Sequence, residues 1–452
     1  MKISITIDFK NYLKNNLVFS VRFDLENKKN RIILNAIAVK AGIRTSNLVV
    51  LDNKSNYLDY IIKDNIITVN ERSFIINYTL NTIFTDCVGF NKKIEFLYPF
   101  INQNELFLGS GSIPYPENLS EISNKLKITT KIINKPEFWN TLSNIKFESN
   151  FLPITDTFFI YSSNENTIHK YTFHGQKNIV DFQIVIQKNK KIPISINKLF
   201  SYINDYCIWL ENNLIPLKHV DKINIIILQT TDNFTELTGN EAMATAENML
   251  NTIIIYGPDN NKYYKKLLNY SDYTKFLYDA ITHELMHSYT TMSWQGKYKS
   301  ILYPDKICPN KDARFIGEAL NIYFHNYYIE NYFSNSNETF ITKIIFDSFI
   351  NYIKNGNDSL MRLFLLDFYL KKNNSSLLEL FSELLKHTKK PYNSLKILFD
   401  TSKKYLNITI NDKFKKIILN ERIADTSVIK SAFEYEGYKI LKNNKIFEVS
   451  KI

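Results

Sequence analysis

Two histidines and a glutamate form the most reactive pattern in the sequence. They are His283, Glu284 and His287, in the segment HELMH. Residues four apart lie on one face of an α-helix, so both imidazoles could bind a single metal ion. Glu284 starts the next turn, where a carboxylate can act as general base toward a water at that ion. The pattern therefore predicts zinc-dependent hydrolytic chemistry, although a helix with ordinary paired histidines would carry the same letters.

A catalytic zinc site needs a third protein ligand and one open position. Glu318 is the best candidate, because the apolar stretch 314–323 around it has helical periodicity and could pack against the first helix. The alternative is a solvated carboxylate paired with Arg314, four residues earlier. Beside HELMH, the pattern favours one zinc ion held by His283, His287 and Glu318.

Two further residues could support the metal ligands. His325 lies two helical turns after Glu318 and shares its face, and Asp279 lies one turn before His283. Each could orient a ligand from outside the coordination shell. Each could equally be an exposed residue of its helix.

The segments around these residues alternate between strand and helix patterns. We expect a helix at 196–213, strands at 158–161, 182–186, 223–229 and 253–256, and a helix at 272–289 that carries HELMH and has Ser271 as its N-cap. After residue 312 the chain reads as mostly helical, and residues 438–451 resemble a hairpin. This part of the chain predicts a mixed α/β region followed by helices.

The first 150 residues show a different pattern, of short strands separated by Asn, Asp and Lys. The strands are expected at 3–9, 17–25, 32–39, 48–51, 61–69, 74–80, 94–98 and 106–108. We therefore predict an α+β multidomain chain. Residues 1–152 would form an antiparallel β-sandwich, and residues 153–452 a catalytic domain that is mixed α/β to about 290 and mainly helical from about 291 to the end.

Composition limits the class of protein. The chain has 452 residues, 44% of them hydrophobic, which is typical of a globular protein with a large core. The net charge is +11, but the lysines are scattered, which favours a lysine-rich composition over a nucleic-acid surface. Three widely spaced cysteines predict neither a disulfide framework nor a cysteine zinc site. Without a recognisable signal peptide or membrane span, a cytoplasmic location with no membrane partner is expected.

HELMHSY followed after a long gap by FIGEALNIYF resembles the glycyl aminopeptidase branch of the gluzincin metallopeptidases. That branch has HExxHSW on its zinc helix and EGxxxYY in its second segment. The 31 positions between His287 and Glu318 fit it better than the more distantly related aminopeptidase N branch. The resemblance implies a thermolysin-like catalytic domain after the N-terminal β-domain. It also implies a C-terminal PDZ domain, which we do not expect in this chain.

The resemblance assigns two more residues. Glu247, in ATAEN, corresponds to the glutamate of the GAMEN or GGLEH segment, which binds the free α-amino group of a peptide. Ala244 replaces the leading glycine of that segment, and an ordinary loop carboxylate is the alternative. Tyr352, before Lys354 and Gly356, is the nearest equivalent of the tyrosine that stabilises the oxyanion. A structural tyrosine is the alternative, because the spacing from Glu318 is short for the family.

These patterns lead to one main hypothesis and two alternatives. The main one is a zinc metallopeptidase, most simply an aminopeptidase acting on short peptides, with Glu284 as general base. The first alternative is a catalytically silent gluzincin-fold protein that binds peptides. The second is a polyanion-binding protein, which the charge alone supports.

Overall fold

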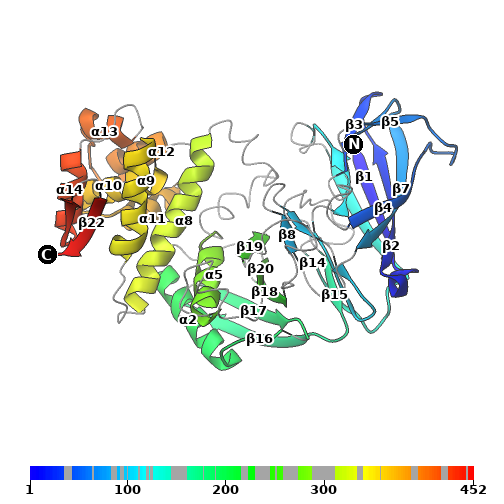
Figure 1. Cartoon of the computed structure of the whole chain (residues 1–452), viewed down its shortest axis with the longest axis horizontal. Coiled ribbons are helices and arrows are strands. Elements are labelled where there is room, and N and C mark those ends of the chain that lie inside the picture. The colour runs from blue at the N-terminus through cyan, green and yellow to red at the C-terminus, as the bar shows by residue number, and fades with distance from the viewer. Residues whose placement is uncertain are drawn as a thin grey trace.

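The computed structural model places β-sheets at one end of an elongated molecule, helices at the other end, and a mixed sheet between them (Figure 1). The structure describes the whole chain apart from the following residues: 35–42, 64–65, 83–88, 92–95, 99, 110–111, 119–121, 123–125, 144–159, 177, 189, 215–221, 230–244, 250–251, 258–272, 288–310, 333–339, 357, 388–394, 419–425 and 444–445.

The N-terminal part is built around two sheets that share one hydrophobic core. The first has the order β13-β1-β2-β7-β4 and the second β12-β3-β6-β5. Their strands are β1 (Lys2–Asp8), β2 (Asn16–Asp24), β3 (Asn30–Ile33), β4 (Ile43–Leu51), β5 (Tyr60–Lys63), β6 (Ile66–Val69), β7 (Ser73–Thr82), β12 (Tyr115–Pro116) and β13 (Lys127–Ile133). Alternation explains the packing, because Ile3, Ile5 and Ile7 of β1 are buried while the residues between them are partly exposed.

Two expectations for this part were wrong in detail. The segment 61–69 is not one strand but an antiparallel pair, β5 and β6. The sheet is not purely antiparallel either, since β1 pairs with β13 in parallel along its whole length. Periodicity indicates which face of a strand is buried, but it does not indicate the direction of the neighbouring strand.

A third sheet, β10-β11-β15-β14, connects the N-terminal part to the middle of the chain. Its strands are β10 (Phe100–Ile101), β11 (Glu105–Leu108), β14 (Asn140–Ser143) and β15 (Ile160–Ser163), and β8 (Gly89–Asn91) pairs separately with β9 (Phe96–Tyr98). β15 follows the predicted boundary at residue 152, yet both of its neighbours precede that boundary. Strand pairing therefore crosses the expected division of the chain.

The middle sheet has the order β16-β17-β18-β20-β19. Its strands are β16 (Thr167–His174), β17 (Ile179–Ile186), β18 (Lys222–Gln229), β19 (Thr245–Met249) and β20 (Thr252–Gly257). β17, β18 and β20 are parallel, and the two edge strands run antiparallel to their neighbours. Ile225 and Ile227 pack with the helices, whereas Ile226 and Leu228 pack with the N-terminal core. Burial of both faces explains why β18 is a continuous apolar run rather than an alternating one.

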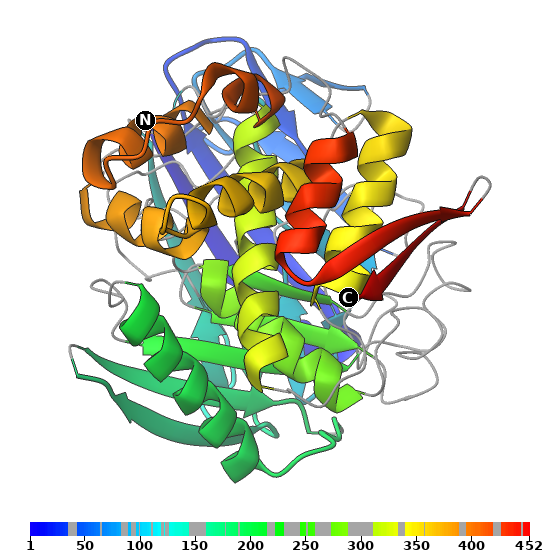
Figure 2. The ribbon, with the colours of Figure 1, turned by 90° about the vertical axis from the view of Figure 1, so that its left-hand side faces the viewer.

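Helices cover one face of the middle sheet and continue to the C-terminus. Figure 2, viewed from the helical end, shows them in front of the strands. They are α2 (Ile196–Asn213), α5 (Tyr273–His287), α8 (Lys311–Tyr332), the π-helical turn η7 (Ile341–Ile345), α9 (Phe346–Asn355), α10 (Ser359–Lys371), α11 (Leu377–His387), α12 (Leu395–Tyr405), α13 (Asp412–Ile418) and α14 (Thr426–Tyr435). Among the described helices, none is both long and apolar enough to cross a lipid bilayer.

The remaining predictions for this part compare closely with the structure. α2 has the predicted bounds, and its first turn is capped by Ser195, whose hydroxyl accepts a hydrogen bond from the backbone N–H of Lys198 at 3.4 Å. The predicted C-terminal hairpin is the antiparallel pair β21 (Tyr438–Asn443) and β22 (Ile446–Lys451). Ser271, the predicted N-cap of α5, lies outside the described residues. The predicted combination of sheets and helices is confirmed, while the division into domains stays a prediction.

Candidate metal site

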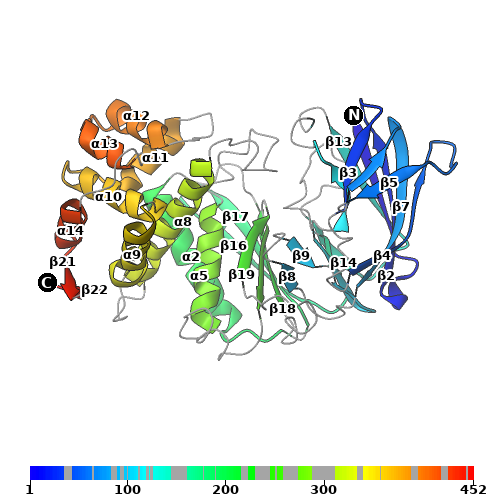
Figure 3. The same cartoon turned by 45° about the horizontal axis from the view of Figure 1, so that its top comes forward.

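The predicted zinc-binding segment ends α5. Leu277, Ile281 and Leu285 lie four residues apart on this helix and are fully buried, so they fix one face of it against the core. His283 and His287 are also four apart and are half-buried, and they present a second face. Figure 3 shows α5 beside α8, next to the middle sheet. The helix is therefore held by apolar packing while both imidazoles remain accessible.

The three predicted residues of α5 converge. One ligand atom from each of His283, Glu284 and His287 lies within 4.8 Å of the other two. The two imidazole centroids are 4.9 Å apart with their planes at 79°. Glu284 is 5% exposed, so its carboxylate is largely withdrawn from water. The two imidazoles match the nitrogen donors that zinc prefers, and the carboxylate of Glu284 lies beside them as the predicted base, so the residues present fit the predicted ion.

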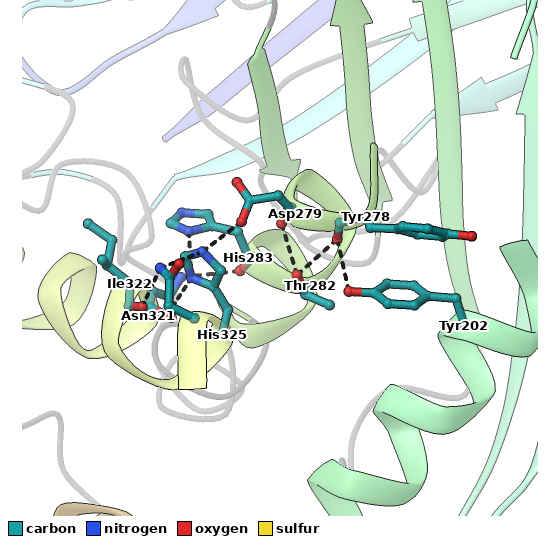
Figure 4. A network of polar contacts seen from close by, with 9 residues as sticks. Tyr202, Tyr278, Asp279, Thr282, His283, Asn321, Ile322 and His325 are labelled. Carbon is teal, nitrogen blue, oxygen red and sulfur yellow. Dashed lines mark hydrogen bonds and ion pairs between the residues drawn. The ribbon is translucent and has the colours of Figure 1, made fainter. Parts of the chain in front are cut away.

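His325 of α8 contacts the first histidine directly. Its Nδ1 lies 3.3 Å from Nδ1 of His283, and its Nε2 lies 3.0 Å from Oδ1 of Asp279 (Figure 4). His325 is 4% exposed, so the alternative of an exposed helix residue is wrong. Asp279, one turn before His283, is directed toward His325 in Figure 4. With Nδ1 of His283 facing His325, the Nε2 atom is the nitrogen that this ring can offer to a metal.

Asn321 also joins α8 to the candidate site, and the sequence reasoning missed it. Its side-chain amide donates to the backbone carbonyl of His283 at 3.3 Å, and the residue is fully buried. Its spacing could have indicated this role, because Asn321 is three positions after Glu318 and therefore shares a helix face with that residue. On the other side of α5, the hydroxyl of Tyr202 in α2 donates to the carbonyl of Tyr278 at 3.4 Å. Helix α5 is thus attached by hydrogen bonds to both α2 and α8.

Glu318 and Glu247 have their backbones described but not their side chains. Glu318 lies on α8, and position 318 shares a helix face with Asn321 and His325, both of which contact His283. Glu247 lies on the edge strand β19, opposite Ile254 of β20, and β19 packs beside α5. The backbone therefore brings both positions to elements that adjoin the histidines, and their roles stay predictions.

Tyr352 lies on α9, in the helical part of the core. It is 2% exposed and belongs to the same buried cluster as Phe349 and Ile345. Its carbonyl accepts the N–H of Gly356, which ends α9 in a left-handed conformation with φ of 71°. These contacts describe a packed helix residue, and the proposed oxyanion role stays a prediction.

Comparison with known proteins identifies the fold. No protein-family model matches the chain, and no curated protein matches its sequence. Solved structures do match. An aminopeptidase N family protein from Idiomarina loihiensis has a TM-score of 0.52 and 10% identity, over 98% of this chain and 79% of that one. An M1 zinc metallopeptidase from Deinococcus radiodurans has a TM-score of 0.53 and 9% identity, over 94% and 95%.

A third match is aminopeptidase A from Legionella pneumophila, in a structure with aspartic acid. Its TM-score is 0.51 with 12% identity, and the match covers 93% of this chain but 49% of the larger protein. At such identities the likeness shows the fold alone. The chain therefore has the fold of M1 zinc metallopeptidases, and the narrower resemblance to glycyl aminopeptidases stays a prediction.

Proposed function

We propose that this protein is a zinc metallopeptidase that removes residues from the N-terminus of short peptides. The observation that carries the proposal is the convergence of His283, Glu284 and His287 within 4.8 Å, in a fold shared with M1 zinc metallopeptidases. His283, His287 and Glu318 would hold one zinc ion. When bound, zinc supplies a Lewis acid that polarises a carbonyl and makes a water more acidic.

The protein residues would carry the proton transfers. Glu284 would take a proton from the attacking water and deliver it to the leaving amine. Its position supports this role, because one of its ligand atoms lies within 4.8 Å of those of both histidines. Tyr352 would donate to the oxyanion if its hydroxyl reaches the scissile carbonyl.

The choice of an exopeptidase depends on Glu247. The edge strand β19 packs beside α5, so a peptide lying along this edge would pass the histidines. A carboxylate at position 247 would pair with the ammonium of the peptide and set the cleavage point. Among the structural neighbours, a mutant of the Deinococcus radiodurans enzyme is bound to a Tyr-Ser-Ala substrate, which supports a short peptide as the substrate class.

The test combines metal content with hydrolysis. Purified protein should contain about one zinc per chain and should cleave aminoacyl reporter substrates. Glu284→Gln should retain zinc and lose activity by about 10²- to 10⁴-fold, as expected for a general base. Glu434→Gln, the same change at an exposed glutamate of α14, is the matched control.

Three results would redirect the proposal. Protein that binds no stoichiometric zinc would refute it. Zinc binding without hydrolysis of a diverse peptide library would favour the catalytically silent peptide-binding protein. Equal cleavage of free and N-acetylated peptides, unchanged in Glu247→Gln, would replace the aminopeptidase by an endopeptidase.

A further inference from the structure

His325 is buried between two helices, and each nitrogen of its ring lies close to two polar atoms. Its Nδ1 lies 2.7 Å from the carbonyl of Asn321 and 3.3 Å from Nδ1 of His283. Its Nε2 lies 3.0 Å from Oδ1 of Asp279 and 3.0 Å from Nδ2 of Asn326. Both ring nitrogens are therefore held, which fixes the rotation of the ring as well as its position.

The surroundings make this polar ring unusual. Leu320 and Phe324 of α8 and Met286 of α5 are buried apolar residues that pack the two helices together. Burying a histidine among them costs free energy unless its hydrogen bonds are satisfied. An apolar residue at position 325 would pack these helices more simply. The polar chain from Asp279 through His325 ends on the ring of His283, so its effect is concentrated on one candidate ligand.

We propose that His325, supported by Asp279, is a positioning residue that sets the orientation of the His283 ring for metal binding; this inference rests on the proposed zinc site. Metal-binding histidines usually have the second ring nitrogen held by a carboxylate, a carbonyl or water. Here Nδ1 of a second histidine, whose N–H donates to the Asn321 carbonyl, lies 3.3 Å from that nitrogen and holds the ring by close contact, and the carboxylate lies behind it. His325 lies outside the convergent group of His283, Glu284 and His287, so it acts through His283 and not as a ligand.

The arrangement has a defined consequence for each residue. Losing the nitrogens of His325 removes a polar contact that orients the His283 ring, so this candidate ligand is less well ordered when metal binds. Losing the charge of Asp279 loosens His325 and acts on His283 only indirectly. The Asp279 side chain is 21% exposed against 5% for His325, so the first effect should exceed the second.

The experiment measures metal affinity and metal geometry, not only activity. His325→Phe keeps an aromatic ring between the helices and removes both nitrogens, and Asp279→Asn keeps the shape and removes the charge. Zinc affinity is measured by competition with a chelator, and the absorption spectrum of the Co²⁺-substituted protein reports the ligand geometry. His174→Ala, which removes an exposed histidine of β16, is the control.

In His325→Phe, zinc should bind about 10- to 100-fold more weakly, and the Co²⁺ spectrum should shift. Asp279→Asn should show a smaller loss, and the double variant should lose no more than His325→Phe, because both residues act in one chain. His325→Gln, which keeps a polar group facing His283, should recover part of the affinity.

Unchanged zinc affinity and an unchanged Co²⁺ spectrum in His325→Phe would overturn the inference, even if the variant melts at a lower temperature. If His325→Phe does not fold, Asp279→Asn decides, and wild-type affinity and spectrum in that variant would overturn the inference as well. A wild-type protein that binds neither zinc nor cobalt would instead refute the proposed function, so the two failures are distinguishable.

Discussion

Helix α8 contributes to two buried polar clusters that are built on opposite principles. The first, here called the ligand cluster, consists of His283, Glu284 and His287, which α8 supports through His325. The second, here called the carboxylate cluster, consists of Tyr323, Asp367, Lys371 and Glu436. Tyr323 and His325 are two residues apart, so neighbouring positions of one helix serve both.

The carboxylate cluster balances each acceptor with a donor. The Tyr323 hydroxyl donates to Oδ2 of Asp367 at 2.6 Å, and the backbone N–H of Leu377 donates to Oδ1 at 2.7 Å. The Lys371 ammonium lies 3.0 Å from Asp367 and 2.6 Å from Glu436. Burial alone would lower the pKa of Lys371, but these two carboxylates hold it above its ordinary value. This cluster is complete within the protein.

The ligand cluster concentrates electron-pair donors at one point. Two imidazoles and a carboxylate have atoms within 4.8 Å of one another. The two imidazoles are donors suited to a divalent cation, and the carboxylate is placed beside them as the proposed base. The comparison teaches that burial of polar groups does not by itself indicate a reactive site. The relevant sign is whether each acceptor faces a donor, as around Asp367, or whether several possible metal ligands converge on one point, as His283 and His287 do.

The largest effect on zinc affinity is expected from a change at His287. His287→Ala should lower zinc affinity by more than the roughly 100-fold typical of a supporting residue, because a direct ligand is lost. The free energy of unfolding of the metal-free protein should hardly change, since this residue is only half-buried. Chelator competition and thermal melting measure the two effects, with His174→Ala as control. Retention of wild-type zinc affinity would show that the ligand cluster is not the metal site.

The opposite result is expected in the carboxylate cluster. Asp367→Ala removes the acceptor for three donors and should lower the free energy of unfolding by about 3 kcal/mol. The folded fraction should keep one zinc per chain with wild-type affinity, because none of these contacts involves the ligand cluster. Urea unfolding of the metal-free protein measures the loss, and Asp347→Ala, at an exposed aspartate of α9, is the matched control. A loss of zinc affinity in a fully folded variant would contradict the separation of the two clusters.

A smaller effect should follow from the tyrosine hydroxyl alone. Tyr323→Phe leaves Asp367 with its lysine and its backbone donor, so the expected loss is about 1.5 kcal/mol, as for one hydrogen bond to a charged group. Tyr327→Phe, at the exposed Tyr327 of the same helix, should be neutral. A difference in urea midpoint between these two variants measures the contribution. Equal midpoints would show that the hydrogen bond from the Tyr323 hydroxyl contributes nothing to the free energy of unfolding.

The sequence revealed the ligand cluster but not the carboxylate cluster, for a physical reason. His283, Glu284 and His287 lie within one and a half helical turns, so spacing alone brings them together. Tyr323 lies on α8, Asp367 on α10 and Glu436 just after the end of α14, and only tertiary packing determines that they meet. The role of His325 was similarly left open, because periodicity places it on a face of α8 without showing what packs against that face.

The same reasoning explains the errors in the fold. The sequence pattern predicted strands at the positions of β1 and β2, but not the parallel pairing of β1 with β13, which joins segments more than a hundred residues apart. The segment 61–69 was predicted as one strand although Lys63, Asp64 and Asn65 separate its two apolar halves. Local patterns thus predict individual strands and helices. Which distant strands pair is known only from the folded structure.

A third buried acid, Glu105, can be compared with these clusters, and its hydrogen-bond donors are neutral side chains. Glu105 of β11 accepts hydrogen bonds from the amide of Gln187 at 2.8 Å and from the hydroxyl of Tyr161 at 3.1 Å. Gln187 in turn accepts the backbone N–H of Gln229 at 2.7 Å, so the network links the third sheet to the middle sheet. Burial raises the pKa of Glu105 above its ordinary value of 4.5, and the two hydrogen bonds only partly oppose this.

The raised pKa sets the sign of a pH effect. The folded protein binds the Glu105 proton more tightly than the unfolded chain does, so this group favours folding most at pH below 4.5. Its contribution is lost as pH rises through the raised value. Relative to Glu105→Gln, the wild type should therefore become less stable across the mildly acidic range. Urea unfolding at several pH values measures this difference, with Glu26→Gln, at an exposed glutamate, as control.

A constant difference between wild type and Glu105→Gln at every pH would show that Glu105 has the same pKa in the folded and unfolded states. Two neutral donors would then stabilise a buried charge as effectively as the lysine does for Asp367. A difference that changes with pH in the expected direction would show that matched hydrogen bonds are not sufficient. In that case the lysine beside Asp367 would be the feature that distinguishes the carboxylate cluster from Glu105, whose hydrogen-bond donors are neutral.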